Sequence, residues 1–323
     1  MGWFFPSVGN EKYVGTTQGK PYLRKRINYF CGRKAIAFGL RLAQVLPVKY
    51  LNALAGSIGI IGFYLIKKYR TIVKNNLQIA FGTSKTQKEY DAIGKTVFRD
   101  TVKNMLEVAR VYSTDPTLAK ELVSIDGLEH LENALSKGKG VVAVSAHMGN
   151  FPLIGPRLIL EGHHFSLILR EPKDSMLGKT LSDLRENVGM ASIPVNPRKV
   201  CVAQSLSALS RNGILFLQID QNASSKDLWV DFFGWMVPTF RGPVVFSMRT
   251  GAPLIPMFMI RDGLDHHKLI IKAPLSLDRT DNKEKDILHN TAKLTKLIEC
   301  YIREYPSQWW WFHRRWKKAR RSN

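Results

Sequence analysis

The sequence predicts an α/β fold with a mixed, mainly parallel sheet flanked by helices on both faces, preceded by an N-terminal membrane-associated helical segment. Three observations support this. The 323 residues, 45% of them hydrophobic, can bury a full core. After about residue 123, short apolar runs alternate with helical periods, as in βαβ units. Two longer apolar segments come earlier. We expect a basic aromatic segment at 1–34, membrane-associated apolar helices at 35–70 and an α/β domain at 71–323.

The two early apolar segments lie at residues 35–46 and 50–66, separated by Pro47 and followed by Lys67, Lys68 and Arg70. The second has 17 residues, which is at the lower limit for crossing a bilayer of roughly 30 Å. We expect a membrane-embedded hairpin, a short span or an interfacial helix pair. An ordinary buried helix pair is the alternative. No signal peptide or myristoylation signal is expected at the N-terminus.

The remaining elements follow in order. A helix at residues 86–112 is expected to serve packing. Strands are expected at residues 141–145, 165–169, 214–219, 229–233, 254–259 and 269–271. Helices are expected at residues 151–160, 176–188, 200–210, 243–249 and 286–304. Asn150 is a suitable N-cap for the first of these helices, with Pro152 in its first turn.

The net charge is +22, which predicts attraction to anionic surfaces such as phospholipid headgroups, acidic carrier proteins or nucleic acid. Residues 309–321 interleave aromatic rings with cations. This pattern suits single-stranded nucleic acid or a membrane interface, and the early apolar segments favour the membrane, with His313 as a structural residue. The three cysteines show no metal or disulfide spacing, and the adjacent histidine pairs at 163–164 and 266–267 offer no ligand set, so no metal or other cofactor is expected.

Polar residues follow three of the expected strands: His147, then Arg170 with Glu171, then Asp220. If these strands are parallel neighbours, their carboxyl ends converge on one crevice. A base, a cationic group and an orienting carboxylate then lie together, although each could instead be a surface residue. The segment 238–256 adds glycine turns with Arg241 and Arg249, which suit either a phosphate contact or a tight helix connection.

Several blocks together resemble the bacterial lysophospholipid acyltransferase-like family that includes the lipid A late acyltransferases. The blocks are SAHMGNF, the spacing from LILRE to residues 185–189 and 193–194, QIDQN, VDFFGWMVPTFRGPVVFSMRTGAPLIP, WWWFHRRW and, earlier, NNLQIAF at 75–81. The resemblance covers nearly the whole chain after residue 35. It implies a membrane-bound enzyme on the cytoplasmic face of the bacterial inner membrane, acting in lipid A and lipopolysaccharide biosynthesis. Such an enzyme moves a fatty acyl group from acyl carrier protein or coenzyme A to a hydroxyl of a glycolipid or lysophospholipid.

The resemblance implies that His147 is the general base. The family acid position is occupied here by Pro152. Three explanations stay open: another carboxylate orients the imidazole, with Asp220 the first choice and Glu171 the second; His147 works alone and slowly; or the chain is a non-catalytic lipid-binding or assembly protein. The backbone amides of Met148 and Gly149 are candidates for the oxyanion site. The expected substrate-binding residues are Arg170, Arg185, Gly149, Asn150, Glu171, Arg241 and Arg249.

Overall fold

The computed structural model describes residues 20–321, without the side chains of residues 20–28 and 48–49. Its N-terminal part is a helical hairpin, α1 (Lys20–Val45) and α2 (Val48–Leu65), followed by α3 (Lys67–Phe81). Pro47 caps the start of α2 with φ −57° and separates it from α1. The expected apolar segments form the second half of α1 and nearly all of α2. The expected domain limits at residues 34 and 70 fall inside α1 and α3.

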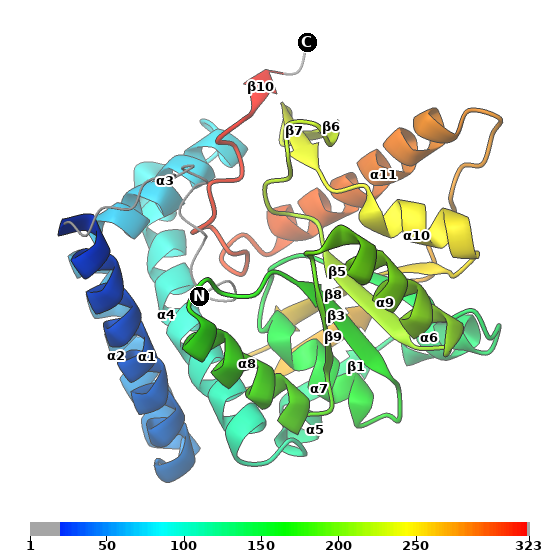
Figure 1. The fold of residues 1–323 in the computed structure, drawn as a ribbon. Helices are drawn as coiled ribbons and strands as arrows, with labels where there is room; N and C mark the ends of the chain where they lie inside the picture. The colour runs from blue at the N-terminus through cyan, green and yellow to red at the C-terminus, as the bar shows by residue number, and fades with distance from the viewer. Residues whose placement is uncertain (1–19, 322–323) are drawn as a thin grey trace.

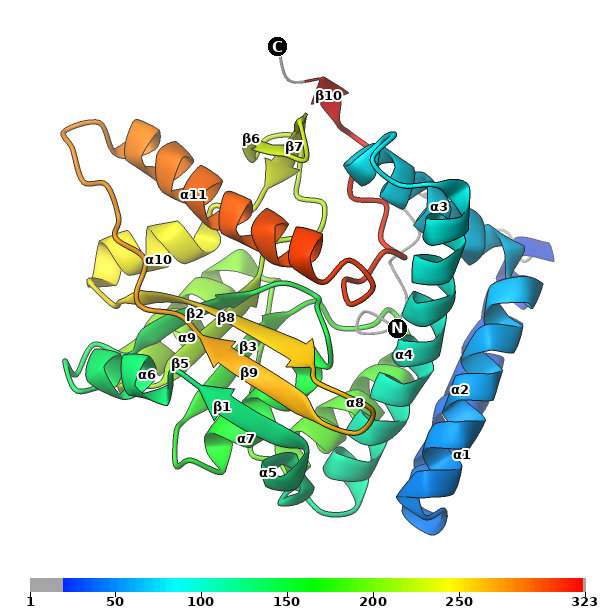
Figure 2. The ribbon, with the colours of Figure 1, turned by 180° about the vertical axis from the view of Figure 1, so that it is seen from behind.

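Helix α4 (Gln87–Ser113) lies between this hairpin and the rest of the molecule (Figures 1 and 2). It confirms the helix expected at 86–112 and begins with a capping box between Thr86 and Glu89. One face of the hairpin packs on α4 through Ala43, Leu51 and Ala55. The opposite face is exposed and apolar, so a hairpin buried on both faces is excluded. Its exposed apolar residues include Phe38, Val45, Tyr50, Leu54, Ile58, Ile61 and Leu65.

The length and composition of these helices limit how they could meet a bilayer. Among residues 20–321, no single helix is long and apolar enough to cross one. The α2 and α3 helices have the length and hydropathy of a membrane span only when taken together, and they meet at a bend of 87°. Crossing and interfacial arrangements of the hairpin therefore both stay predictions.

The core of the molecule is a seven-stranded sheet in the order β1-β9-β8-β2-β5-β3-β4. All neighbours are parallel except β8 and β9, so the mixed, mainly parallel sheet is confirmed. The bounds are β1 (Val123–Asp126), β2 (Val141–Ser145), β3 (Phe165–Leu169), β4 (Ala191–Pro194), β5 (Ile214–Gln218), β8 (Leu254–Arg261) and β9 (His267–Ile271). The short strands β1 and β4 are absent from the sequence prediction.

Helices cover both faces of this sheet, as its alternating side chains require (Figure 1). Val142 and Val144 of β2 face one core, with residues of α9 (Arg198–Ser210), α10 (Gly242–Thr250) and α11 (Lys283–Glu304). Val141 and Ala143 face the other, with residues of α5 (Leu118–Leu122), α6 (Leu128–Leu135) and α7 (Ile154–Ile159). Helix α8 (Ser175–Asn187) packs beside β4 and α4. Every residue of β2 is buried, which makes this strand a rigid support for the turn after it.

Three local predictions differ from the structure. The expected strand at 229–233 is β6 (Leu228–Phe232), but it pairs antiparallel with β7 (Trp235–Thr239) in a separate sheet that also holds β10 (Arg320–Arg321). The helix expected at 151–160 begins as a short 3₁₀ turn, η1 (Phe151–Leu153), and continues as α7. Asn150 occupies the N-cap position of η1, as expected, but its side chain donates to Glu107 and makes no capping hydrogen bond with the first turn.

The aromatic C-terminal segment belongs to the protein core rather than to a membrane interface. Trp309, Trp311, Phe312 and Trp316 are buried, with exposed fractions of at most 7%. Arg315 is also fully buried and donates to the carbonyl oxygens at residues 221 and 238 and to the hydroxyl at residue 239. The expectation of membrane-contacting rings here is wrong, because these rings fill the space above the sheet between α3, β6 and α11.

Candidate active site

The sheet register brings His147 and Asp220 together. β2 and β5 are neighbouring parallel strands, and Ser145 is paired with Gln218. His147 and Asp220 each lie two residues beyond this pair, at the carboxyl edge of the sheet. Two side chains from positions 73 residues apart in the sequence therefore meet outside the strand ends, where open α/β sheets bind ligands.

Asp220 contacts His147 through both of its carboxylate oxygens. The Nδ1 atom of His147 lies 2.8 Å from Oδ1, and the His147 backbone N–H donates to Oδ2 at 2.8 Å. The indole N–H of Trp309 donates to the same Oδ2 at 2.7 Å. Burial by itself raises the pKa of Asp220, but the charge of His147 and these hydrogen bonds outweigh burial and lower that pKa to about 2. Because an ionised carboxylate only accepts, Nδ1 carries the proton and Nε2 is the basic nitrogen.

The imidazole of His147 opens on a cleft between α4 and the C-terminal segment. Asp100, Thr101 and Asn104 of α4 line one side, and residues 307–310 line the other. The His147 side chain is 14% exposed, and the ring of Phe151 supports it edge-on at 5.0 Å. No described residue forms a hydrogen bond with Nε2, so this nitrogen can receive a proton from a group in the cleft. An imidazole whose Nδ1 is bound to a carboxylate and whose Nε2 faces a cleft is suited to general base catalysis.

The expected oxyanion site in the turn after His147 is not present in this structure. The backbone amides of Met148 and Gly149 were candidates for an oxyanion site, yet both already donate within the protein. The Met148 N–H donates to the carbonyl of Ala146 at 2.8 Å, and the Gly149 N–H donates to the carbonyl of Gln308 at 2.8 Å. Neither amide is available to a substrate oxygen in this conformation. Gly149 itself does line the cleft.

Glu171 and Arg185 form an ion pair with each other. The Arg185 Nη2 atom lies 2.7 Å from Glu171 Oε1, so Glu171 does not reach His147 and the second-choice carboxylate is excluded in this structure. Arg185 is 2% exposed, and the cleft does not include it. Arg170 is exposed at the end of β3, outside the cleft lining.

The two arginines of the segment 238–256 also lie outside the cleft. Arg241 forms an ion pair with Glu284 at 3.0 Å, and Arg249 is exposed on the last turn of α10. The structure therefore brings His147, Gly149 and Asp220 together. The arginines at positions 241 and 249 lie apart from them. Their predicted contacts with substrate stay predictions.

Pro152, at the family acid position, is buried in the 3₁₀ turn η1. It lines a small apolar pocket with Phe165 and Met190, and its carbonyl accepts a hydrogen bond from Tyr112 at 2.7 Å. No carboxylate is required at this position to hold the imidazole, because Asp220 already binds Nδ1.

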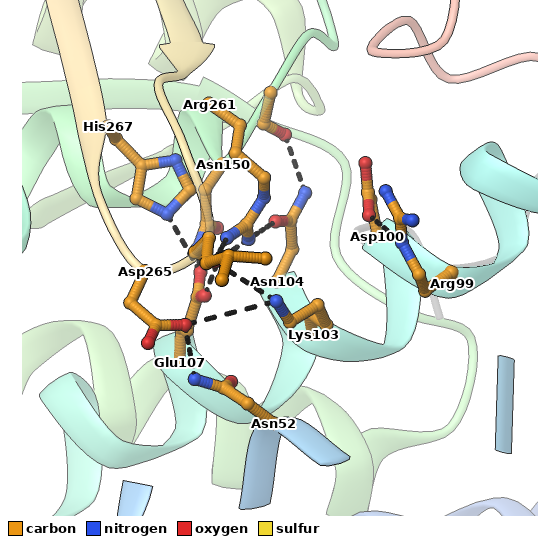
Figure 3. Close-up of polar contacts among 12 residues, drawn as sticks. Asn52, Arg99, Asp100, Lys103, Asn104, Glu107, Asn150, Arg261, Asp265 and His267 are labelled. Carbon is orange, nitrogen blue, oxygen red and sulfur yellow. Dashed lines mark hydrogen bonds and ion pairs between the residues drawn. The ribbon is translucent and has the colours of Figure 1, made fainter. Parts of the chain in front are cut away.

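A second polar cluster contacts residues 149 and 150, and the sequence interpretation missed it (Figure 3). Glu107 of α4 binds Arg261 of β8, His267 of β9 and Asn150. The interpretation of the helix at 86–112 as packing alone is therefore incomplete. The available signal was the set of polar residues at 100, 103, 104 and 107, which recurs at helical spacing among apolar ones.

Comparison with known proteins defines the class to which this fold and site belong. A family model described as bacterial lipid A biosynthesis acyltransferase matches residues 18–318. The chain belongs to this family, and the resemblance drawn from its sequence blocks is confirmed. The family is one of acyltransferases, which agrees with an α/β sheet that carries a histidine and a carboxylate at its strand ends.

The individual relatives share less than a third of their residues with this chain. The chain is 27% identical over 193 residues to a phosphatidylinositol mannoside acyltransferase of Mycobacterium tuberculosis, and the match covers 59% of each chain, less than two thirds of that relative. It is 23% identical over 275 residues to a lipid A biosynthesis palmitoleoyltransferase of Escherichia coli, covering 84% of this chain and 86% of the relative. The crystal structure of a 1-acyl-sn-glycerophosphate acyltransferase from Thermotoga maritima aligns with a TM-score of 0.40 and 12% identity, covering 80% of this chain and 99% of that one.

Proposed function

We propose that this protein is an O-acyltransferase that moves a fatty acyl chain from a thioester donor, acyl carrier protein or coenzyme A, to a hydroxyl of a lipid acceptor. The acceptor is a glycolipid of the lipid A type or a lysophospholipid. The observation that carries the proposal is the hydrogen bond between His147 Nδ1 and the buried carboxylate of Asp220 beside a cleft. Membership of an acyltransferase family supports the same reaction class.

The reaction follows from the state of the imidazole. Nε2 of His147 removes the proton of the acceptor hydroxyl as that oxygen attacks the thioester carbonyl carbon, which forms the new C–O bond. Asp220 stabilises the imidazolium and keeps the ring in the productive tautomer. The tetrahedral intermediate then collapses, the C–S bond breaks, and the imidazolium returns its proton to the leaving thiolate. No covalent acyl-enzyme is needed.

A transfer assay with purified enzyme tests this proposal. Radiolabelled acyl carrier protein thioester and acyl coenzyme A are each offered with separated membrane lipid fractions, and labelled lipid is quantified. We expect ester-linked label in one lipid class and a loss of at least about 1,000-fold in the variant His147→Ala. Unaltered transfer by that variant would exclude the assigned base. Stable lipid binding by the wild-type protein without any transfer would favour the non-catalytic alternative.

We also propose that the protein acts on the cytoplasmic face of the bacterial inner membrane, held there by the exposed apolar face of α1 and α2. Residues such as Phe38, Ile58, Ile61 and Leu65 are 43–77% exposed, and apolar area gathered on one face marks an interaction surface. Lys67 and Lys68 follow directly at the start of α3, where cations can contact anionic headgroups. Helix α4 packs along this hairpin and also lines the cleft, so the site would open close to the lipid surface.

Vesicle flotation tests this attachment. The double variant Ile58→Ser, Ile61→Ser removes apolar area from the exposed face without touching the cleft, and we expect at least about tenfold weaker binding to phosphatidylglycerol vesicles. Leu288→Ser is the control, because it makes the same kind of aliphatic-to-serine change at a residue that is 36% exposed on α11, and it should leave binding unchanged. Equal binding by all three proteins would show that the hairpin is not the membrane-contacting surface.

A further inference from the structure

Glu107 is the centre of a buried network that the transfer chemistry does not use. Its side chain is 7% exposed. The guanidinium of Arg261 donates to both carboxylate oxygens, at 2.9 Å and 2.8 Å, and Nε2 of His267 lies 2.8 Å from Oε2. The Asn150 side-chain amide donates to Oε2 at 2.7 Å. Figure 3 shows these partners converging on Glu107 from different segments of the chain.

The protonation state of this network is defined by its partners. Burial alone raises the pKa of Glu107, but the hydrogen bond from His267 and the charge of Arg261 lower that pKa to about 2. Burial lowers the pKa of His267, so its ring is neutral and donates through Nε2. Glu107 is therefore an ionised acceptor that is saturated by donors from β8, β9 and the His147 turn.

The network holds the turn at residues 149–150, which follows His147. Asn150, fully buried, is bound by Glu107, and the Gly149 carbonyl accepts from the Asn104 side-chain amide at 2.9 Å. Asn104 is bound in turn by Arg261. Helix α4 thus holds the backbone carbonyl of Gly149 and the side chain of Asn150 through Asn104 and Glu107, which both bind Arg261.

The backbone of the turn also packs closely against β8. Gly149 has φ +55°, and a Cβ atom at this position would lie 2.1 Å from the carbonyl oxygen of Met259 in β8. The Gly149 N–H is bound by Gln308, whose side chain also bonds both backbone groups of Arg261. His147 is only two residues away, so a shift of the turn moves the imidazole relative to Asp220.

We propose that Glu107 is a positioning residue for acyl transfer, which fixes the turn at residues 149–150 and thereby sets the position of the His147 imidazole against Asp220 and the cleft. This inference rests on the proposed function of His147. Misplacing a catalytic group by about 1 Å can cost on the order of 100-fold in rate. We therefore expect Glu107→Gln to lower kcat by about 10- to 100-fold, with KM changed less than about threefold.

The variants separate positioning from stability. Glu107→Gln replaces an acceptor oxygen by an amide that opposes the donors of Arg261 and Asn150, whereas Asn150→Ala cuts only the link to the turn. Glu299→Gln is the matched control. Glu299 is 1% exposed, is bound by Lys296 and Arg303, and accepts the backbone N–H at residue 233 outside the cleft. A stabilising role alone predicts that all three variants lower Tm while the folded protein keeps wild-type kcat.

A second readout does not depend on turnover. The proton on His147 Nδ1, bound to a buried carboxylate, should give a low-field imidazole N–H signal in the NMR spectrum of wild type that is missing from His147→Ala. We expect it to shift or vanish in Glu107→Gln and Asn150→Ala and to persist in Glu299→Gln. A moved signal in the two network variants, combined with a wild-type protein that transfers no acyl group, would keep the positioning role and exclude the proposed function. An unmoved signal with unchanged kcat in both network variants, or an equal loss in Glu299→Gln, would overturn the inference.

Discussion

Replacing Asp220 by Asn tests the catalytic geometry most directly. The buried carboxylate accepts three hydrogen bonds, from His147 Nδ1, the His147 backbone N–H and the Trp309 indole. An asparagine oxygen can keep the two donors at the Oδ2 position, which points its amide NH₂ at Nδ1. That amide can only donate, so the imidazole must take the tautomer with its proton on Nε2. The base then has no free nitrogen facing the cleft.

The size of the loss can be worked out in two ways. Two unit charges about 4 Å apart attract by about 4 kcal/mol at an effective dielectric constant of about 20, and this stabilisation of the imidazolium disappears with the carboxylate. At 1.36 kcal/mol per decade, that is about 1,000-fold in rate. The tautomer change in a comparable histidine–aspartate arrangement costs about 10⁴. We therefore expect kcat of Asp220→Asn to fall between about 10³- and 10⁴-fold.

The assay is initial-rate acyl transfer at saturating donor, with folding checked by circular dichroism and thermal unfolding. Asp286→Asn is the control. Asp286 lies in the first turn of α11, is 2% exposed, accepts two hydrogen bonds from Thr280 and lies outside the cleft. We expect this control to retain kcat within about threefold. A folded Asp220→Asn protein with more than a tenth of wild-type kcat would refute the assignment of Asp220 as the orienting carboxylate.

Three further outcomes follow from the same structure. Gly149→Ala should lower the unfolding free energy by at least about 3 kcal/mol, against about 1 kcal/mol for Gly138→Ala. Both glycines have positive φ, but only a Cβ at 149 meets the carbonyl of Met259, so equal losses in denaturant unfolding would refute the clash. Burial lowers the pKa of His313 from 6.5 to about 4, so acidification between these values protonates only the unfolded chain and removes up to about 3 kcal/mol of stability. His313→Gln, which keeps an acceptor at the Nε2 position, should lose that pH dependence in thermal unfolding. Pro152→Glu should cost at least about 3 kcal/mol without raising kcat, since the new carboxylate enters an apolar pocket; higher turnover would contradict this.

The parts of the site that the sequence predicted are those set by the sheet. A buried run ending in His147 and another ending in Asp220 indicated two strand ends, and parallel neighbours must place such ends on one edge. Asp220 could therefore be predicted from the sequence as the carboxylate that faces His147. The remaining polar strand end could not be resolved in the same way. Glu171 leaves the sheet beyond β3, and an ion pair with Arg185 of α8 turns it away from the site.

The parts that the sequence did not predict depend on which surface a segment meets. Trp309 lies in a string of rings and cations, and this composition is the same whether the rings enter a membrane interface or a protein core. The rings enter the protein core because they meet long-range partners above the sheet, such as the Asp220 carboxylate that accepts from the Trp309 indole. Asn150 was predicted as a helix cap because the local pattern allows it. The long-range acceptor Glu107 binds it instead, and no local pattern contains that information.

The absence of an acid at position 152 has a physical explanation in this arrangement. An acid supplied five residues after the histidine depends on the conformation of the intervening turn, which contains Gly149 and a 3₁₀ start. An acid supplied by the next strand depends instead on the register of β2 and β5, whose pairing fixes both backbones over five consecutive residue pairs. The burial of Asp220 and its bond to Trp309 then remove the remaining freedom of the carboxylate. Once the sheet orients the imidazole in this way, position 152 is free to hold an apolar residue that packs in the core beside Phe165 and Met190, as Pro152 does.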